Sequence, residues 1–210
     1  MNLLVINNRS GTGLARLDEV LSDSFSRTYV LFREEAPQWK IPTSIDLLVS
    51  LGSDWSVNDP SLANLIGKEL ELISFLDARS CPILGICFGA QLISKTFGGL
   101  VTRNPYPEIG WHEIVEVGNF PMLTRSWMQW HFDSFTVPKT FSLIAENSVG
   151  PQALLRGKTL GVQFHPEVDK QTIEQWVSDR DQIVPNFGGI DFDELLRLTD
   201  IELLRNRGTA

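Results

Sequence analysis

Residues 82–91, "PILGICFGAQ", place a cysteine between two glycines with G-x-C-x-G spacing. The apolar run before Cys87 predicts a strand and the residues after it predict a helix, so the cysteine stands at a strand-to-helix turn. This arrangement is typical of a nucleophile elbow, here with sulfur in place of a serine oxygen. Because side chains at the two flanking positions would collide with the neighbouring strand and helix, we expect Gly85 and Gly89 to be required. The alternative, which we favour for Cys81, is an inert buried cysteine.

The position of Cys87 would also favour its reactive form. A thiol at the N-terminus of a helix lies near the positive end of the helix dipole, which stabilises the nucleophilic thiolate. The backbone N–H of Phe88, the next residue, points in a suitable direction to bind an oxyanion. Gln91 lies one helical turn after Cys87 on the same face, where it could hold a substrate beside the sulfur.

The segment 161–168, "GVQFHPEV", supplies a base and a residue to orient it. His165 and Glu167 are two apart in an extended segment, so their side chains leave on the same face. Glu167 can accept a hydrogen bond from one imidazole nitrogen, which leaves the other nitrogen facing the thiol. Pro166 biases His165 toward extended geometry. The combination with Cys87 predicts a catalytic triad of nucleophile, base and orienting carboxylate.

Longer segments around these residues carry a family resemblance. "PILGICFGAQL" and "LGVQFHPEV" resemble the class I glutamine amidotransferase domain, and the similarity covers most of the chain. Residues 108–112, "EIGWH", and 129–138, "QWHFDSFTVP", resemble more narrowly the stand-alone, GMP-synthase-glutaminase-like branch of that family.

The resemblance implies roles for five residues. Cys87 would be the nucleophile, His165 the base and acid, and Glu167 the orienting residue. Gln91 would contact the substrate, and the Phe88 backbone would contact the oxyanion. The implied substrate is glutamine or another γ-glutamyl amide.

The loop after the third predicted strand, "LGSDWSVND", departs from the family pattern. Family members usually carry a Gly-Gly-Pro-type loop here, which donates the second oxyanion N–H. Gly52 matches the first glycine, whereas Ser53 replaces the second and Asp54 the proline. An oxyanion donor is worth roughly 3 kcal/mol, and serine tolerates positive φ less well than glycine. We therefore predict either a reshaped hole or one that forms only with substrate or a partner, with Ser53 as the donor and Gly52 beside the substrate.

Two further histidines need interpretation. The resemblance places the loop 129–138, with Trp130 and His131, beside the α-amino and carboxylate groups of glutamine, although a packed structural histidine explains His131 nearly as well. His112 is interpreted as structural, since nothing near it has catalytic spacing. Gly11-Thr12-Gly13 lacks the third glycine of a dinucleotide loop, so it is interpreted as a turn.

Strands and helices alternate over the first hundred residues, which predicts right-handed βαβ units. We expect an α/β, three-layer flavodoxin-like fold with a mainly parallel sheet flanked by helices. After residue 100, short extended segments predict a small β-rich extension, with "LGVQF" returning to the main sheet. The chain length suits a single domain over residues 1–210. The expected elements are strands near 3–6, 28–32, 45–51 and 82–86, a loop over 33–43, and helices near 14–25, 60–79, 88–97, 168–179 and 191–206.

Composition excludes several classes of function. The formal net charge is −8 and no cluster of Lys or Arg occurs, so we expect no nucleic-acid or membrane partner. The chain has neither an apolar run of about 20 residues nor a signal peptide, so a cytoplasmic location is expected. Two cysteines without metal-ligand spacing predict no metal, no cofactor and no disulfide.

Three functions remain open. The leading hypothesis is a glutaminase that forms a γ-glutamyl thioester on Cys87. Its ammonia would pass to a separate synthetase partner, because no synthetase domain fits in 210 residues. The second is a γ-glutamyl hydrolase or peptidase with the same triad. The third is a catalytically silent regulatory binding protein that keeps the fold.

Overall fold

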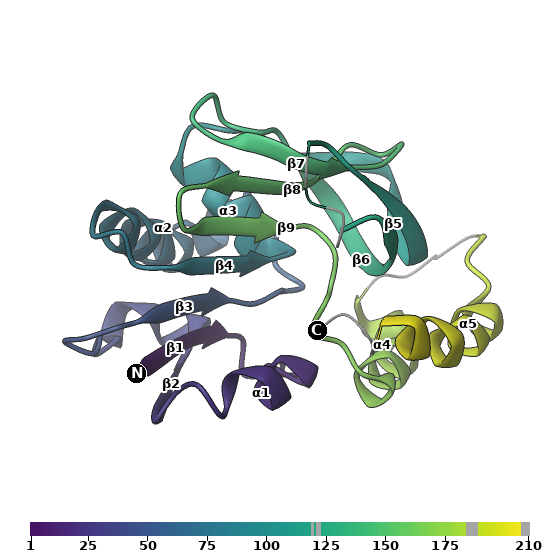
Figure 1. Cartoon of the computed structure of the whole chain (residues 1–210), viewed down its shortest axis with the longest axis horizontal. Coiled ribbons are helices and arrows are strands. Elements are labelled where there is room, and N and C mark those ends of the chain that lie inside the picture. The colour runs from purple at the N-terminus through teal and green to yellow at the C-terminus, as the bar shows by residue number, and fades with distance from the viewer. Residues whose placement is uncertain (119, 121–122, 184–188, 207–210) are drawn as a thin grey trace.

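A mixed β-sheet forms the centre of the computed structural model, which describes residues 1–118, 120, 123–183 and 189–206. Nine strands of this part of the chain follow the order β2-β1-β3-β4-β9-β8-β7-β5-β6 (Figure 1). The strands are β1 Asn2–Asn7, β2 Arg27–Phe32, β3 Leu47–Ser50, β4 Ile83–Ile86, β5 Val101–Glu116, β6 Arg125–Phe135, β7 Ser142–Glu146, β8 Pro151–Arg156 and β9 Thr159–Val162.

The sheet has a parallel half and an antiparallel half. Strands β2, β1, β3, β4 and β9 pair in parallel, and β9, β8, β7, β5 and β6 pair antiparallel. Strand β9 returns to the main sheet beside β4, as expected. The predicted α/β fold with a β-rich extension is confirmed. The extension continues the main sheet, which is therefore more mixed than a mainly parallel one.

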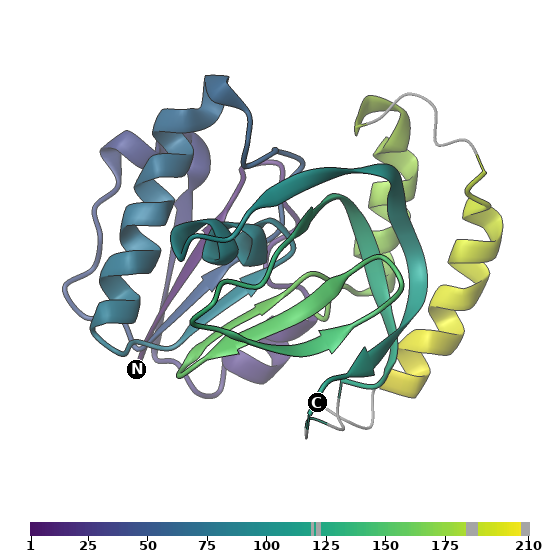
Figure 2. The ribbon, with the colours of Figure 1, turned by 90° about the horizontal axis from the view of Figure 1, so that it is seen from above.

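Helices cover both faces of the parallel half. Residues alternate along β1, so that Leu4 and Ile6 pack on the side of α2 and α3 while Leu3 and Val5 pack on the side of α1. Helices α4 and α5 lie side by side against β5 and β6, away from α2 (Figure 2). The helical segments are α1 Arg16–Leu21, η1 Arg33–Gln38, η2 Pro60–Leu62, α2 Ala63–Ala78, α3 Phe88–Thr96, α4 Lys170–Ile183 and α5 Phe192–Arg205.

Two local predictions are wrong. The expected loop over 33–43 begins with a 3-10 helix, η1, that contains Pro37; the fixed φ of proline suits a 3-10 turn of this length. The expected loop over 129–138 is largely strand β6, which runs to Phe135. Residues 128–133, "MQWHFD", do alternate apolar and polar residues as a strand does, so the sequence held the signal that the loop interpretation passed over. The polar residues Gln129, His131 and Asp133 are buried.

The turn between β4 and α3 holds Cys87 in a strained conformation. Its φ of 50° and ψ of −105° are uncommon for a residue with a side chain. A Cβ on Gly85 would lie 2.6 Å from the backbone of Gly89, and a Cβ on Gly89 would lie 2.1 Å from the Ser50 carbonyl oxygen. The collisions that the sequence predicted on both sides of the cysteine are therefore present.

Gly89→Ala is expected to lower the free energy of unfolding by about 1–3 kcal/mol, the usual cost of overpacking. The matched control is Gly67→Ala in α2, where an added Cβ would meet no heavy atom within 4 Å. Because alanine is the better helix former, this control is expected to gain about 0.5–1 kcal/mol. Urea denaturation measures both changes. If the two variants are equally stable, the contact between β3 and α3 is not the reason for the glycine.

Candidate active site

A buried histidine and carboxylate meet after β9. His165 Nδ1 lies 2.7 Å from Glu167 Oε1, and both side chains are almost fully buried. The His165 backbone N–H donates to the Met128 carbonyl of β6 at 2.8 Å. Glu167 thus holds the side chain of His165, and the antiparallel half of the sheet holds its backbone.

Cys87 and His165 come together at the backbone of Gly52. A Cβ built on Gly52 would lie 3.0 Å from His165 Cε1 and 3.7 Å from Cys87 Cβ. The carboxyl ends of β3, β4 and β9 therefore converge on one point. Within the described ranges, His165 Nε2 and Glu167 Oε2 are buried atoms without a hydrogen-bond partner. His165 Nε2 is the nitrogen left to exchange a proton beside the sulfur.

The surroundings of His165 favour its charged form. Burial by itself lowers the pKa of His165, but its electrostatic and hydrogen-bonding interactions with Glu167 and Cys87 outweigh this effect. Together they raise the pKa from 6.5 to about 10. At neutral pH the ring is therefore an imidazolium placed between a carboxylate and the sulfur.

The two predicted oxyanion donors lie on opposite sides of Cys87 in the chain. Phe88 is the first residue of α3, so its N–H belongs to the helix N-terminus, where it has no intrahelical acceptor. In the described part of the chain, the Ser53 N–H donates no hydrogen bond, and the Ser53 hydroxyl accepts from the Trp55 N–H at 3.1 Å. Neither Gly52 nor Ser53 has a positive φ. The conformational strain expected for serine at this position therefore does not arise.

The residues predicted to contact substrate are largely tied to other protein groups. Gln91 is buried, and its Nε2 donates to the Asp133 carbonyl at 3.1 Å, which links α3 to β6. His131 Nε2 lies 2.8 Å from Glu108 Oε2, and His131 Nδ1 lies 3.1 Å from the Asp133 carbonyl. Both nitrogens of His131 are thus engaged within the protein.

Trp130 approaches the sulfur through its backbone. Its carbonyl oxygen lies 3.9 Å from Cys87 Sγ, whereas its ring packs against Trp176 of α4 at a centroid distance of 5.6 Å. His112, interpreted from the sequence as structural, has its Nε2 3.1 Å from the Ile109 carbonyl. Neither ring lies among the groups that converge on Gly52.

Two residues near the triad were not identified from the sequence. Gln163 Nε2 lies 3.6 Å from Cys87 Sγ, and Trp176 meets the His165 ring edge-on at 4.8 Å between centroids. Gln163 precedes His165 by two positions, so period-2 alternation along an extended segment could have found it. Trp176 comes from a separate helix, and no spacing in the sequence connects it with His165.

Among the described residues, no group of three His, Cys, Asp or Glu side chains is placed to hold a metal ion. Cys81 and Cys87 are both free thiols, as the sequence predicted. Over the same residues, no helix is long and apolar enough to cross a membrane.

Comparisons with curated proteins find relatives of similar local sequence. A GMP synthase (glutamine-hydrolyzing) from Thermosipho africanus is 35% identical over 147 residues, which cover 63% of this chain and 28% of that protein. A protein from Thermococcus kodakarensis, named as one subunit of a GMP synthase (glutamine-hydrolyzing), is 38% identical over 114 residues, which cover 50% of this chain and 61% of that protein. The chain thus spans less than two thirds of the length of these relatives.

Solved structures share the fold. A glutamine amidotransferase from Thermotoga maritima has a TM-score of 0.88 at 24% identity, covering 100% of this chain and 94% of that one. A glutamine amido transferase from Methylobacillus flagellatus has a TM-score of 0.81 at 23% identity, covering 98% and 89%. The sequence model described as glutamine amidotransferase class-I matches residues 49–180, more than half of the chain. The chain therefore belongs to the class-I glutamine amidotransferase family.

Proposed function

We propose that the protein is a glutaminase that hydrolyses the side-chain amide of glutamine through a thioester on Cys87. The observation that carries the proposal is the meeting of Cys87 and His165 at Gly52, with Glu167 hydrogen-bonded to the far side of an imidazolium ring. A thiolate beside an imidazolium is the activated pair that acyl transfer requires. Cys87 is the catalytic nucleophile, His165 is the general acid and base, and Glu167 is the positioning residue that holds the imidazole.

The reaction proceeds in two halves. The Cys87 thiolate attacks the amide carbon, and the C–N bond breaks as His165 gives its proton to the leaving nitrogen, which departs as ammonia. A water molecule then attacks the thioester while His165 accepts its proton. Collapse of the second tetrahedral intermediate releases glutamate and restores the thiolate and imidazolium.

Each tetrahedral intermediate carries a negative oxygen that needs donors. The N–H groups of Phe88 and Ser53 are the candidates, because the first lies at a helix N-terminus and the second has no acceptor within the described residues. Two such donors aimed at the developing charge would supply a large share of the rate enhancement. Trp130 is assigned to the substrate site through its carbonyl, which lies near the sulfur.

The released ammonia is proposed to pass to a separate synthetase partner. Support comes from two relatives, from Thermococcus kodakarensis and Pyrococcus furiosus, that are named as single subunits of a GMP synthase (glutamine-hydrolyzing). They are 38% and 37% identical to this chain over about half of its length. This chain aligns with 61% and 62% of the two proteins.

Purified protein is expected to release ammonia from glutamine, and Cys87→Ala is expected to abolish this release because no other group can form the thioester. Cys81→Ala is the matched control, since Cys81 is a buried thiol whose Sγ contacts the Ile45 carbonyl, outside the site; its activity should remain unchanged. A coupled glutamate dehydrogenase assay measures the ammonia.

The same assay separates the alternatives when glutamine is replaced by a panel of γ-glutamyl amides and peptides. A clear preference for γ-glutamyl peptides would point to a γ-glutamyl hydrolase. Turnover that Cys87→Ala retains would contradict the thioester. Silence on every substrate, also after addition of cell extract, would favour a regulatory binding protein.

The kcat/KM for glutamine is expected to fall as the pH rises through about 10, because His165 must be protonated to expel ammonia and its pKa is about 10. Glu167→Gln should move this fall to lower pH, since the neutral amide no longer stabilises the imidazolium. The raised pKa also contributes stability that is fully present below pH 6.5 and lost as the pH rises through about 10.

Initial rates across this pH range, with circular dichroism at each pH to follow unfolding, test the expectation. If kcat/KM falls at the same pH in the wild type and in Glu167→Gln, the role given to His165 is contradicted.

A further inference from the structure

An arginine is buried behind the loop that follows β3. Arg33 begins η1, and its side chain is only 2% exposed. Its Nε lies 2.8 Å from Glu69 Oε2, and its Nη2 lies 3.2 Å from Glu69 Oε1, so the two groups form a two-pronged ion pair. The desolvation of such a pair largely offsets its attraction, so stability alone is a weak reason for placing it here.

The remaining donors of Arg33 reach the loop itself. Nη2 donates to the Leu51 carbonyl at 2.7 Å, and Nη1 donates to the Gly52 carbonyl at 3.1 Å. Nη1 also donates to Asn8 Oδ1 at 2.8 Å. One guanidinium, oriented by Glu69, therefore holds two consecutive carbonyl groups at the point where Gly52 meets the triad.

The direction of the Gly52 carbonyl determines where the Ser53 N–H points. In a trans peptide the C=O and the N–H point in opposite directions, and no cis bond occurs among the described residues. A carbonyl held toward Arg33 therefore directs the Ser53 N–H away from Arg33. Rotating this peptide would leave a buried guanidinium N–H without its acceptor, which carries the full cost of desolvation.

Arg33 also contacts the other side of the candidate oxyanion site. Its guanidinium carbon lies 4.8 Å from the centre of the Phe88 ring, and that ring is buried. Phe88 supplies the second candidate N–H and directly follows Cys87. A single side chain thus touches the peptide that carries one donor and the residue that carries the other.

We propose that Arg33 is a positioning residue for the oxyanion site. Held by Glu69, it orients the Gly52–Ser53 peptide and supports Phe88, so that both N–H groups face the reacting carbon before substrate arrives. This inference rests on the proposed glutaminase function. It accounts for a loop in which serine replaces glycine: a charged side chain orients the peptide, and no positive φ is needed.

Arg33→Lys is expected to lower kcat for glutamine by about 10²-fold, the usual loss when one oxyanion donor is misplaced, with little change in KM. Lysine keeps the charge but cannot reach both carbonyls and Glu69 together. The KM is spared because the oxyanion exists only in the transition state. Glu69→Gln, which leaves Arg33 less firmly oriented, should act in the same direction with a smaller effect.

Alkylation of Cys87 by iodoacetamide gives the readout that a general structural role would not match. Displacement of iodide forms no oxyanion, so the alkylation rate should stay within about twofold of wild type in both variants while kcat falls. Free methylguanidinium is expected to restore part of the kcat of an Arg33→Ala variant. Thermal unfolding followed by circular dichroism confirms that each variant is folded.

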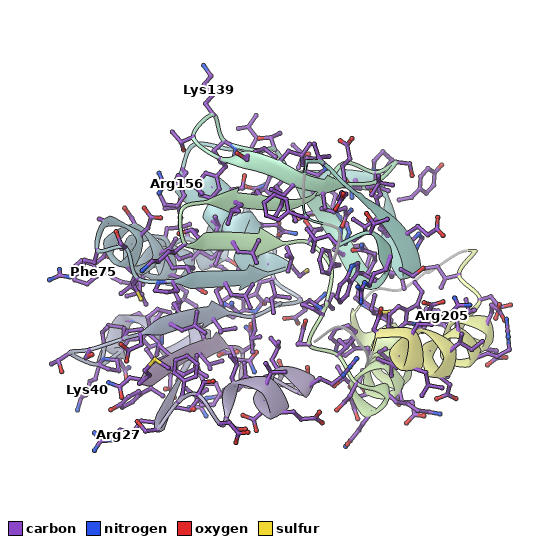
Figure 3. The ribbon with its side chains drawn as sticks, in the orientation of Figure 1. Arg27, Lys40, Phe75, Lys139, Arg156 and Arg205 are labelled. Atoms are coloured by element: carbon purple, nitrogen blue, oxygen red, sulfur yellow. The ribbon has the colours of Figure 1, made fainter. Side chains whose placement is uncertain are left out.

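Arg156→Lys is the matched control. Arg156 also pairs with a carboxylate, Asp77, and stacks on aromatic rings. It lies toward the left edge of Figure 3, paired with Thr159 at the start of β9, the opposite end of that strand from the site. Its kcat should equal that of wild type.

Alkylation that falls in parallel with kcat, or a loss confined to KM, would overturn the proposal. If Arg33→Lys does not fold, Glu69→Gln decides by the same two measurements. A wild-type protein that turns over no γ-glutamyl amide would overturn the proposed function itself, and the inference with it.

Discussion

The backbone hydrogen bond from the Cys87 N–H to the Val162 carbonyl, 2.8 Å long, joins the strand that ends at the cysteine to the strand that leads to the histidine. It extends the parallel pairing of β4 with β9 beyond the last paired residues, Ile86 and Val162. A turn as strained as that at Cys87 persists only where neighbouring contacts leave it no alternative. The close approach of Gly89 to Ser50 provides the second such contact. The position of the sulfur therefore depends on backbone packing among three strands and one helix.

Buried charges surround this point in pairs. His165 is paired with Glu167, and Arg33 is paired with Glu69. An unpaired charge at such depth would be very costly, so each group needs its partner if it is to stay charged without water. The desolvation cost of these two pairs goes together with an orienting role. The first pair sets the imidazole, and the second holds the carbonyl groups of the neighbouring loop.

The antiparallel half of the sheet supports the site as well as enlarging the fold. Strand β6 accepts a hydrogen bond from the His165 backbone at Met128, and it brings the Trp130 carbonyl to the sulfur. Helix α4, packed on β5 and β6 with α5, places the Trp176 ring against His165. An enzyme with the parallel half alone would keep the cysteine turn but would lose the groups that close around the imidazole.

The sequence by itself determined the local features. The glycines around Cys87, the proline after His165 and the alternation of apolar strands with helices each reflect short-range sterics or periodicity. They predicted the elbow, the His165–Glu167 spacing and the α/β fold. Only the tertiary structure decided which distant groups meet. Strand β6 carries an alternating pattern over residues 128–133 that could have been recognised, whereas Arg33 lies in a segment that looked like a charged loop. Its contacts with Glu69 and Gly52 depend on packing across 36 and 19 residues of chain, and long-range packing leaves no periodic signal in a single sequence.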